Sequence, residues 1–277
     1  MMPLYIHWNI DPVLINLGFT EIRYYAILFV GGLVMGAYVV KRMFSKEGLH
    51  PDLIYTLSFY VLIGTVIGAR LGHCLFYEPE YYLRHPLEMI LPFAKDASGS
   101  WHFAGYKGLA SHGGIIGVLV ASYLFVRKKK LSYLWLLDRV AIAGALVGCF
   151  IRIGNFFNSE IIGLPSTLPW AVVFEQVSSV PRHPAQLYEA LAYLAIFGLL
   201  MCLYKYKQTE LKNGFILGIF LVLLFLARFL IEFIKVRQAG FEDSMDLDMG
   251  QLLSIPFIAV GIVLIALKWP QKSKEAK

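Results

Sequence analysis

Seven long apolar stretches dominate the sequence and constrain its fold more than any other feature. Each approaches about 20 residues, the length at which an α-helix crosses the hydrocarbon core of a bilayer. Because 58% of the 277 residues are hydrophobic, the chain is too apolar for an ordinary soluble domain. The runs are continuous and lack the alternation of barrel strands, which argues against a β-barrel. The stretches span residues 23–40, 53–76, 109–126, 133–150, 185–204, 214–234 and 250–269.

We therefore predict an all-α polytopic membrane protein with about seven transmembrane helices, forming a single membrane-embedded domain over residues 1–277. Basic residues set its orientation, because cytoplasmic loops carry an excess of Lys and Arg. Fourteen of them lie at 41–46, 127–130, 205–212 and 268–277, and seven lie in the alternate loops. This places the N-terminus outside and the C-terminus in the cytoplasm. The net charge of +6 then reflects membrane topology and predicts no nucleic-acid partner.

Two extracytoplasmic loop regions follow from this topology, at residues 78–108 and 155–184. The second contains Pro165, Pro169, Pro181 and Pro184, which argue against a continuing helix. Because the cytoplasmic connections are short, we expect the chemistry of the protein to lie outside the membrane or near the outer leaflet. Glycines at helical spacing in the apolar stretches, such as Gly64 and Gly68, predict close helix packing.

Residues 148–163 read GCFIRIGNFFNSEIIG and end the fourth apolar stretch with a polar cluster. Arg152, Asn155, Asn158 and Glu160 fall within nine positions. Ionisable groups at membrane depth are costly unless they have partners, so they indicate a functional site. The alternative for Arg152 alone is a side chain that extends to lipid headgroups.

Further arginines are expected at the same depth. Arg228 and Glu232 are four residues apart and so lie on one helix face, which is equally compatible with a structural ion pair. Arg70 comes late in the second apolar segment and Arg152 comes late in the fourth, both towards the outer side. Three arginines with few carboxylate partners predict an anionic ligand. The planar guanidinium fork suits phosphate, and a phospholipid is the phosphate most available at that depth.

Weaker signals surround these arginines. His112, in Ser111-His112-Gly113-Gly114, can exchange a proton near neutral pH, although a lone interfacial His is more often a packing residue. Glu189 lies at the polar beginning of the fifth apolar stretch, where it either complements the helix dipole or contacts substrate. Tyr25 starts the first stretch on the same side. The spans hold no HExxH or paired CxxC motif, so we predict no metal and no cofactor.

The ordered set of motifs resembles the prolipoprotein diacylglyceryl transferase family over essentially the whole chain. The Arg-x-Gly-Asn-Phe-x-Asn-x-Glu core is highly specific, and Tyr25 and Arg70 also fit the family pattern. The matching segments are Ser111-His112-Gly113-Gly114, Arg152 to Gly163, Arg182-His-Pro-Ala-Gln-Leu-Tyr-Glu189, Arg228 to Glu232, and Asp248-Met-Gly-Gln-Leu-Leu-Ser-Ile-Pro256.

The resemblance implies a transferase of the bacterial cytoplasmic (inner) membrane that acts in lipoprotein biosynthesis. Such an enzyme moves the diacylglyceryl group of phosphatidylglycerol to the lipobox cysteine thiol of a prolipoprotein signal peptide. The reaction forms a thioether and releases glycerol phosphate, without metal or nucleotide. Membrane lipids are the remaining partners, and helix gaps are expected to admit the lipid and the signal helix.

The resemblance also implies roles for individual residues. His112, Arg152 and Arg228 are the implied catalytic residues. His112 either takes the thiol proton, or positions the lipid while the arginines lower the thiol pKa. The implied substrate-binding residues are Arg152, Asn155, Asn158, Glu160, Gly163, Arg70, Tyr25, Glu232 and His183. The alternative class is an anion or lipid transporter that uses the same arginines as a pathway, although transporters often show internal repeats and none is found.

Overall fold

Seven long helices account for most of the chain in the computed structural model. They are α1 (Tyr24–Lys46), α2 (Leu53–Phe76), α5 (Ser111–Lys129), α6 (Tyr133–Phe157), α7 (Ala185–Lys207), α8 (Phe215–Glu232) and α9 (Met249–Lys268). Two short helices, α3 (Pro79–Tyr82) and α4 (Pro86–Ile90), lie between α2 and α5. The structure describes residues 5–18, 20–90, 93–95, 100–103, 110–207, 210–237 and 245–269.

The helices confirm the predicted all-α membrane fold. Within the described residues, α1, α2, α6, α7, α8 and α9 are long and apolar enough to cross a membrane. The remaining long helix, α5, ends in Arg127, Lys128 and Lys129 and is not among these six. The number of crossings and the orientation therefore stay predictions.

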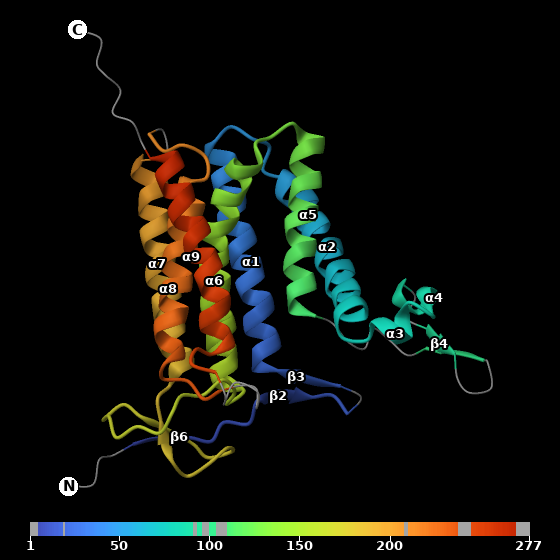
Figure 1. Ribbon diagram of the computed structural model, residues 1–277. Helices are drawn as coiled ribbons and strands as arrows, with labels where there is room; N and C mark the ends of the chain where they lie inside the picture. Colours follow the sequence, from blue (N-terminus) through green and yellow to red (C-terminus); the bar gives the residue numbers. More distant parts are fainter. Residues whose placement is uncertain are drawn as a thin grey trace. The chain divides into compact units, whose positions relative to one another are not determined.

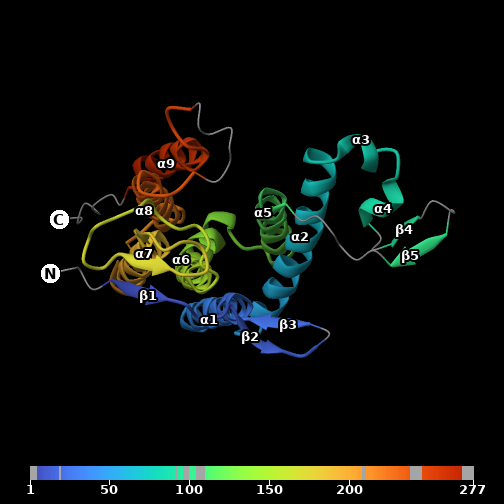
Figure 2. The same cartoon turned by 90° about the horizontal axis from the view of Figure 1, so that it is seen from below.

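Contacts group the chain into two compact units, and each is described by itself. The first, here called the signature unit, comprises Met1–Val40 and Leu137–Lys277, and the second comprises Lys41–Leu136. In the signature unit, α6, α7, α8 and α9 run side by side with the first part of α1 (Figures 1 and 2). At the lower end in Figure 1, α6 and α8 end, whereas α1, α7 and α9 begin.

Short strands cover this end of the signature unit. A three-stranded sheet has β6 (Val172–Phe174) at its centre, parallel to β1 (Ile6–Trp8) and antiparallel to β7 (Pro181–Arg182). Phe156 of α6 packs with Val172 and Phe174 in a buried cluster. A separate hairpin joins β2 (Val13–Asn16) to β3 (Glu21–Arg23). The region predicted as the loop 155–184 thus starts inside α6, which continues through Phe157, and then forms part of this sheet.

Glycines set the closest helix contacts, as predicted. A Cβ on Gly32 of α1 would lie 2.8 Å from Phe150 of α6, and one on Gly36 would lie 2.9 Å from Val147. In the second unit, a Cβ on Gly117 of α5 would overlap the backbone oxygen of Gly64 on α2. Small residues thus let the backbones of neighbouring helices approach one another, as is common in membranes.

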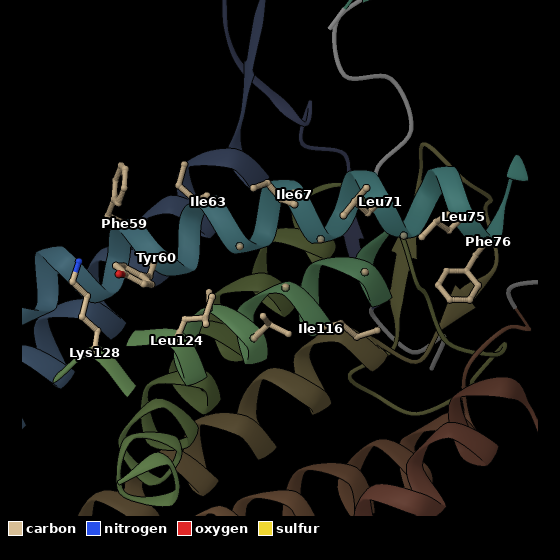
Figure 3. A pocket seen from close by; sticks show the side chains of 17 residues that line it. Phe59, Tyr60, Ile63, Ile67, Leu71, Leu75, Phe76, Ile116, Leu124 and Lys128 are labelled. Atoms are coloured by element: carbon tan, nitrogen blue, oxygen red, sulfur yellow. The ribbon is translucent and has the colours of Figure 1, made fainter. Parts of the chain in front are cut away.

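In the second unit, α2 and α5 pack along each other. The described part of the region predicted as the loop 78–108 contains α3, α4 and two short strands. Strands β4 (Phe93–Lys95) and β5 (Trp101–Phe103) pair antiparallel. An apolar cleft of about 710 Å³ runs along α2 and α5, with Phe59 and Lys128 towards one end and Phe76 at the other (Figure 3).

Candidate active site

Arg152 lies near the end of α6 and pairs with a buried carboxylate. Its Nε is 3.0 Å from Oε2 of Glu189, which lies in the second turn of α7. The Glu189 side chain is 0% exposed and that of Arg152 is 12% exposed. Burying either charge without the other would cost several kcal/mol. The sequence offered a helix-dipole role or a substrate contact for Glu189, and the structure shows an ion pair that ties α7 to α6.

An amide relay connects Arg152 to the rest of the signature. Arg152 Nη1 donates a hydrogen bond to Asn155 Oδ1 at 3.2 Å, and Asn155 Nδ2 donates to Glu160 Oε1 at 2.7 Å. Asn158 Nδ2 donates to the same Glu160 oxygen at 3.2 Å. The predicted cluster of a cation, two amides and a carboxylate therefore forms one connected network.

The backbone after α6 turns sharply to bring Glu160 back to the helix end. Ser159 and Ile161 adopt positive φ angles of 53° and 58°, a conformation that costs about 1–2 kcal/mol for residues other than glycine. Hydrogen bonds hold the turn: Glu160 N donates to Asn155 O at 3.1 Å, and Gln186 Nε2 donates to Glu160 O at 2.6 Å. The strained turn thus serves to place the Glu160 side chain.

Two tyrosines lie against this network. Tyr25 at the start of α1 packs on Gly154, where an added Cβ would lie 2.8 Å from its ring, and it is within electrostatic range of Arg152 and Glu160. Tyr193, which is buried, lies within electrostatic range of both Arg152 and Arg228. It therefore has two of the predicted arginines as neighbours.

Arg228 differs from Arg152 in having no counter-ion in the part of the chain that the structure describes. Within the described residues, its half-buried guanidinium makes neither a hydrogen bond nor an ion pair. The structural ion pair with Glu232 that the sequence left open is not formed. Instead, Glu232 Oε2 lies 2.9 Å from Lys235 Nζ, and the same ammonium is 3.7 Å from Glu189 Oε1.

Several buried acceptors in this region have unused capacity. Among the described residues, Gln186 Oε1 and Asn158 Oδ1 accept no hydrogen bond, nor do the two carboxylate oxygens of Glu189, whose contact with Arg152 is an ion pair of poorer hydrogen-bond geometry. A buried acceptor without a donor is costly. The network can therefore accept hydrogen bonds from a ligand that carries hydroxyl or thiol groups.

Gly163 has a packing function that the sequence did not reveal. Its N–H donates to His183 O at 3.0 Å, and a Cβ there would lie 2.5 Å from that oxygen and 2.9 Å from Ile234 O. His183 lines a cavity of about 510 Å³ with Pro165 and Ser166, among others. Direct substrate contact by Gly163 or His183 stays a prediction.

The remaining predicted residues belong to the second unit. Arg70 is buried and donates to Glu88 O at 2.7 Å and to Met89 O at 3.3 Å, with its guanidinium 4.8 Å from the centre of the Tyr82 ring. These contacts hold α4 against α2. His112 is the second residue of α5, and its side chain lies outside the described part. Their participation in the site stays a prediction.

Sequence reasoning missed three contributors to the site. Lys235 was taken only as an outer-loop cation, Tyr193 was not singled out, and Glu189 was not paired with Arg152. One signal was present: Gln186 and Glu189 are three residues apart and so face one side of α7. Among the described residues, no group of three or more His, Cys, Asp or Glu side chains is placed to hold a metal ion.

These features define a multi-pass membrane protein with a half-buried cationic site at one end of a helical bundle. A family model described as prolipoprotein diacylglyceryl transferase matches residues 12–267. Proteins named phosphatidylglycerol–prolipoprotein diacylglyceryl transferase are similar along nearly the whole chain. That of Bacteroides fragilis is 46% identical over 98% of both chains, and that of Tolumonas auensis is 47% identical over 97% of this chain and 100% of its own. That of Chloroherpeton thalassium is 44% identical, over 94% and 93%. The chain belongs to the prolipoprotein diacylglyceryl transferase family.

Proposed function

We propose that this protein transfers the diacylglyceryl group of phosphatidylglycerol to the lipobox cysteine of a prolipoprotein. The relatives' names give both substrates. The cysteine sulfur forms a bond to the glycerol C3 carbon of the diacylglyceryl group, the C3–O bond to phosphate breaks, and glycerol phosphate leaves with that electron pair. The observation that carries the proposal is Arg228, a half-buried guanidinium that forms no ion pair with any described residue and that shares the neighbour Tyr193 with Arg152.

The arginines act on the leaving group. A phosphodiester carries one negative charge, and its departure as a monoester adds a second. Fixed donors aimed at developing charge stabilise the transition state more than the ground state. Arg228 supplies a positive charge that pairs with no described carboxylate, and Arg152 keeps part of its donor fork for the ligand. Together they grip the phosphate and stabilise the charge that forms on it.

The amide relay binds the glycerol headgroup. Glycerol hydroxyls are donors, and Asn158 and Gln186 each present a buried acceptor without a partner. Glu160 is exposed, and both amides donate to its Oε1, which leaves its other oxygen available to a hydroxyl donor. Tyr25 closes the side of the network at Gly154. These hydroxyls distinguish phosphatidylglycerol from phosphatidylethanolamine, so the relay is the element that selects between these two lipids.

His112 takes the thiol proton in this proposal. A cysteine thiol has a pKa about 2 units above that of histidine, so the transfer is uphill and is helped by the cationic field of the arginines. Glu232 supports the site by its contacts with Lys235 and the start of α9. The product thioether carries no charge at sulfur.

The test is to incubate purified protein with phosphatidylglycerol and a lipobox peptide and to weigh the peptide. A mass gain of one diacylglyceryl unit that Arg152→Ala and Arg228→Ala abolish supports the enzyme. Lipid or anion movement across vesicle membranes without any adduct would instead support the transporter class.

A further inference from the structure

Four charged side chains at the site are joined by ion pairs, and Arg228 is not one of them. Arg152, Glu189, Lys235 and Glu232 follow one another in a chain of contacts at 3.0, 3.7 and 2.9 Å. All four side chains are at most 12% exposed. Two positive and two negative charges cancel within this chain, which we call the buried quartet. Arg228 stands outside it and forms no ion pair with any described residue.

Sequence spacing alone would pair Glu232 with Arg228. The two residues are four apart on α8, the distance at which opposite charges meet on a helix. Lys235, three residues after Glu232, competes for the same carboxylate. In the structure Glu232 pairs with Lys235, whose ammonium lies 2.9 Å from Glu232 Oε2.

Backbone hydrogen bonds explain why Glu232 pairs with Lys235. After α8, residues 234–236 are hydrogen bonded to the end of the signature: Leu164 N donates to Ile234 O at 2.8 Å, and Val236 N donates to Ile162 O at 3.2 Å. Gly163 forms a bridge with Lys235 between these bonds. This clamp fixes the backbone of Lys235 and leaves its side chain 3% exposed, between the two carboxylates.

Glu232 is held on its other side by α9. A Cβ on Gly250 would lie 2.5 Å from the Glu232 carboxyl carbon, so the carboxylate rests against the first turn of that helix. The positive end of the helix dipole there favours a carboxylate. Lys235 and the start of α9 therefore both contact the Glu232 carboxylate and hold it away from Arg228.

We propose that Lys235 is a positioning residue that withholds Glu232 from Arg228 and so keeps Arg228 free for the lipid phosphate. The inference rests on the proposed function, because it assigns the phosphate to Arg228. It implies that loss of Lys235 weakens phosphate binding because the released Glu232 carboxylate pairs with Arg228. Removing that carboxylate as well restores phosphate binding.

The experiment compares wild type with Lys235→Met, Glu232→Gln, Lys235→Met/Glu232→Gln and the conservative control Lys235→Arg. KM and kcat are measured with phosphatidylglycerol as the varied substrate in mixed micelles, and thermal unfolding is followed for each variant. Lys235→Met is expected to raise KM about 10- to 100-fold, the scale of one charge-assisted interaction. A smaller change in kcat and a near-normal KM for Lys235→Arg are expected.

The double variant decides the matter. Its KM is expected to match that of Glu232→Gln within about twofold, because in both variants the Glu232 carboxylate that Lys235 withholds from Arg228 is absent. This comparison holds even if Lys235→Met alone fails to fold. An unchanged KM in a folded Lys235→Met, or a double variant with a KM as poor as that of the single variant or tenfold above that of Glu232→Gln, would overturn the inference. If wild type forms no adduct, the proposed function fails, and the dissociation constant for phosphatidylglycerol replaces KM in the same comparison.

Discussion

Glu189 and Arg152 form a buried ion pair across α6 and α7, which are connected in sequence by residues 158–184. Their closest atoms are 3.0 Å apart, and the Glu189 side chain has no exposure to solvent. The pair fixes Arg152 at the end of α6 and leaves part of its guanidinium for the Asn155 relay. Phosphate recognition in this account depends on that placement.

Loss of the Glu189 charge should destabilise the protein. Glu189→Gln leaves Arg152 buried without its counter-ion, and breaking a buried pair from one side costs about 3–5 kcal/mol. The free energy of unfolding in mixed micelles measures this cost. Glu175→Gln is the matched control, because its pair with His7 is exposed, and it should change stability by about 1 kcal/mol at most. Equal effects of the two substitutions would contradict a supporting role for Glu189.

Arg228 should be needed for turnover and dispensable for folding. Arg228→Ala is expected to lower kcat/KM by about 100-fold or more, the scale of one lost transition-state donor. Arg228→Lys should fall between Ala and wild type, because it keeps the charge and loses the fork. Arg23→Ala is the control at the same end of the bundle, where Arg23 pairs on the surface with Glu21. An inactive Arg23→Ala, or an active Arg228→Ala, would refute the assignment.

Gly163 should not tolerate a methyl group. Gly163→Ala would push the signature away from the backbone of His183 and Ile234, and overpacking of this kind costs about 1–3 kcal/mol. Thermal unfolding should show the loss, with reduced activity because the same clamp holds Lys235. At Gly198 of α7, a Cβ would meet nothing within 4 Å. Gly198→Ala should therefore keep or slightly raise stability, by about 1 kcal/mol or less.

His112 should affect rate and not folding. If His112 takes the thiol proton, the His112→Gln variant is expected to have the same thermal stability as wild type and a lower rate of peptide modification. Raising the pH should partly rescue the variant, because more of the substrate thiol ionises without a base. Peptide mass followed over time at several pH values measures this. Turnover equal to wild type would remove His112 from the proton transfer.

Much of the fold follows from local sequence. Each of the seven predicted apolar stretches became a helix, because length and hydrophobicity are properties of the segment itself. The ends were less predictable. The fourth stretch was predicted to end at residue 150, yet α6 continues to Phe157, because Arg152 and Asn155 find partners that let polar residues remain helical.

Long-range contacts escaped prediction. The three-residue strands β1 and β6 pair across most of the chain, and no local pattern announces such a pairing. The partner of Glu232 was missed for a similar reason. Its choice between Arg228 and Lys235 depends on a backbone clamp from the distant Ile162 to Leu164 segment.

A structure of the protein with bound phosphatidylglycerol would show where the lipid phosphate lies. We predict the phosphate within hydrogen-bonding distance of the guanidinium groups of both Arg152 and Arg228, with the glycerol hydroxyls on the Asn158 and Gln186 acceptors. A phosphate held elsewhere, with Arg228 turned to Glu232 or to the lipid tails, would contradict this prediction.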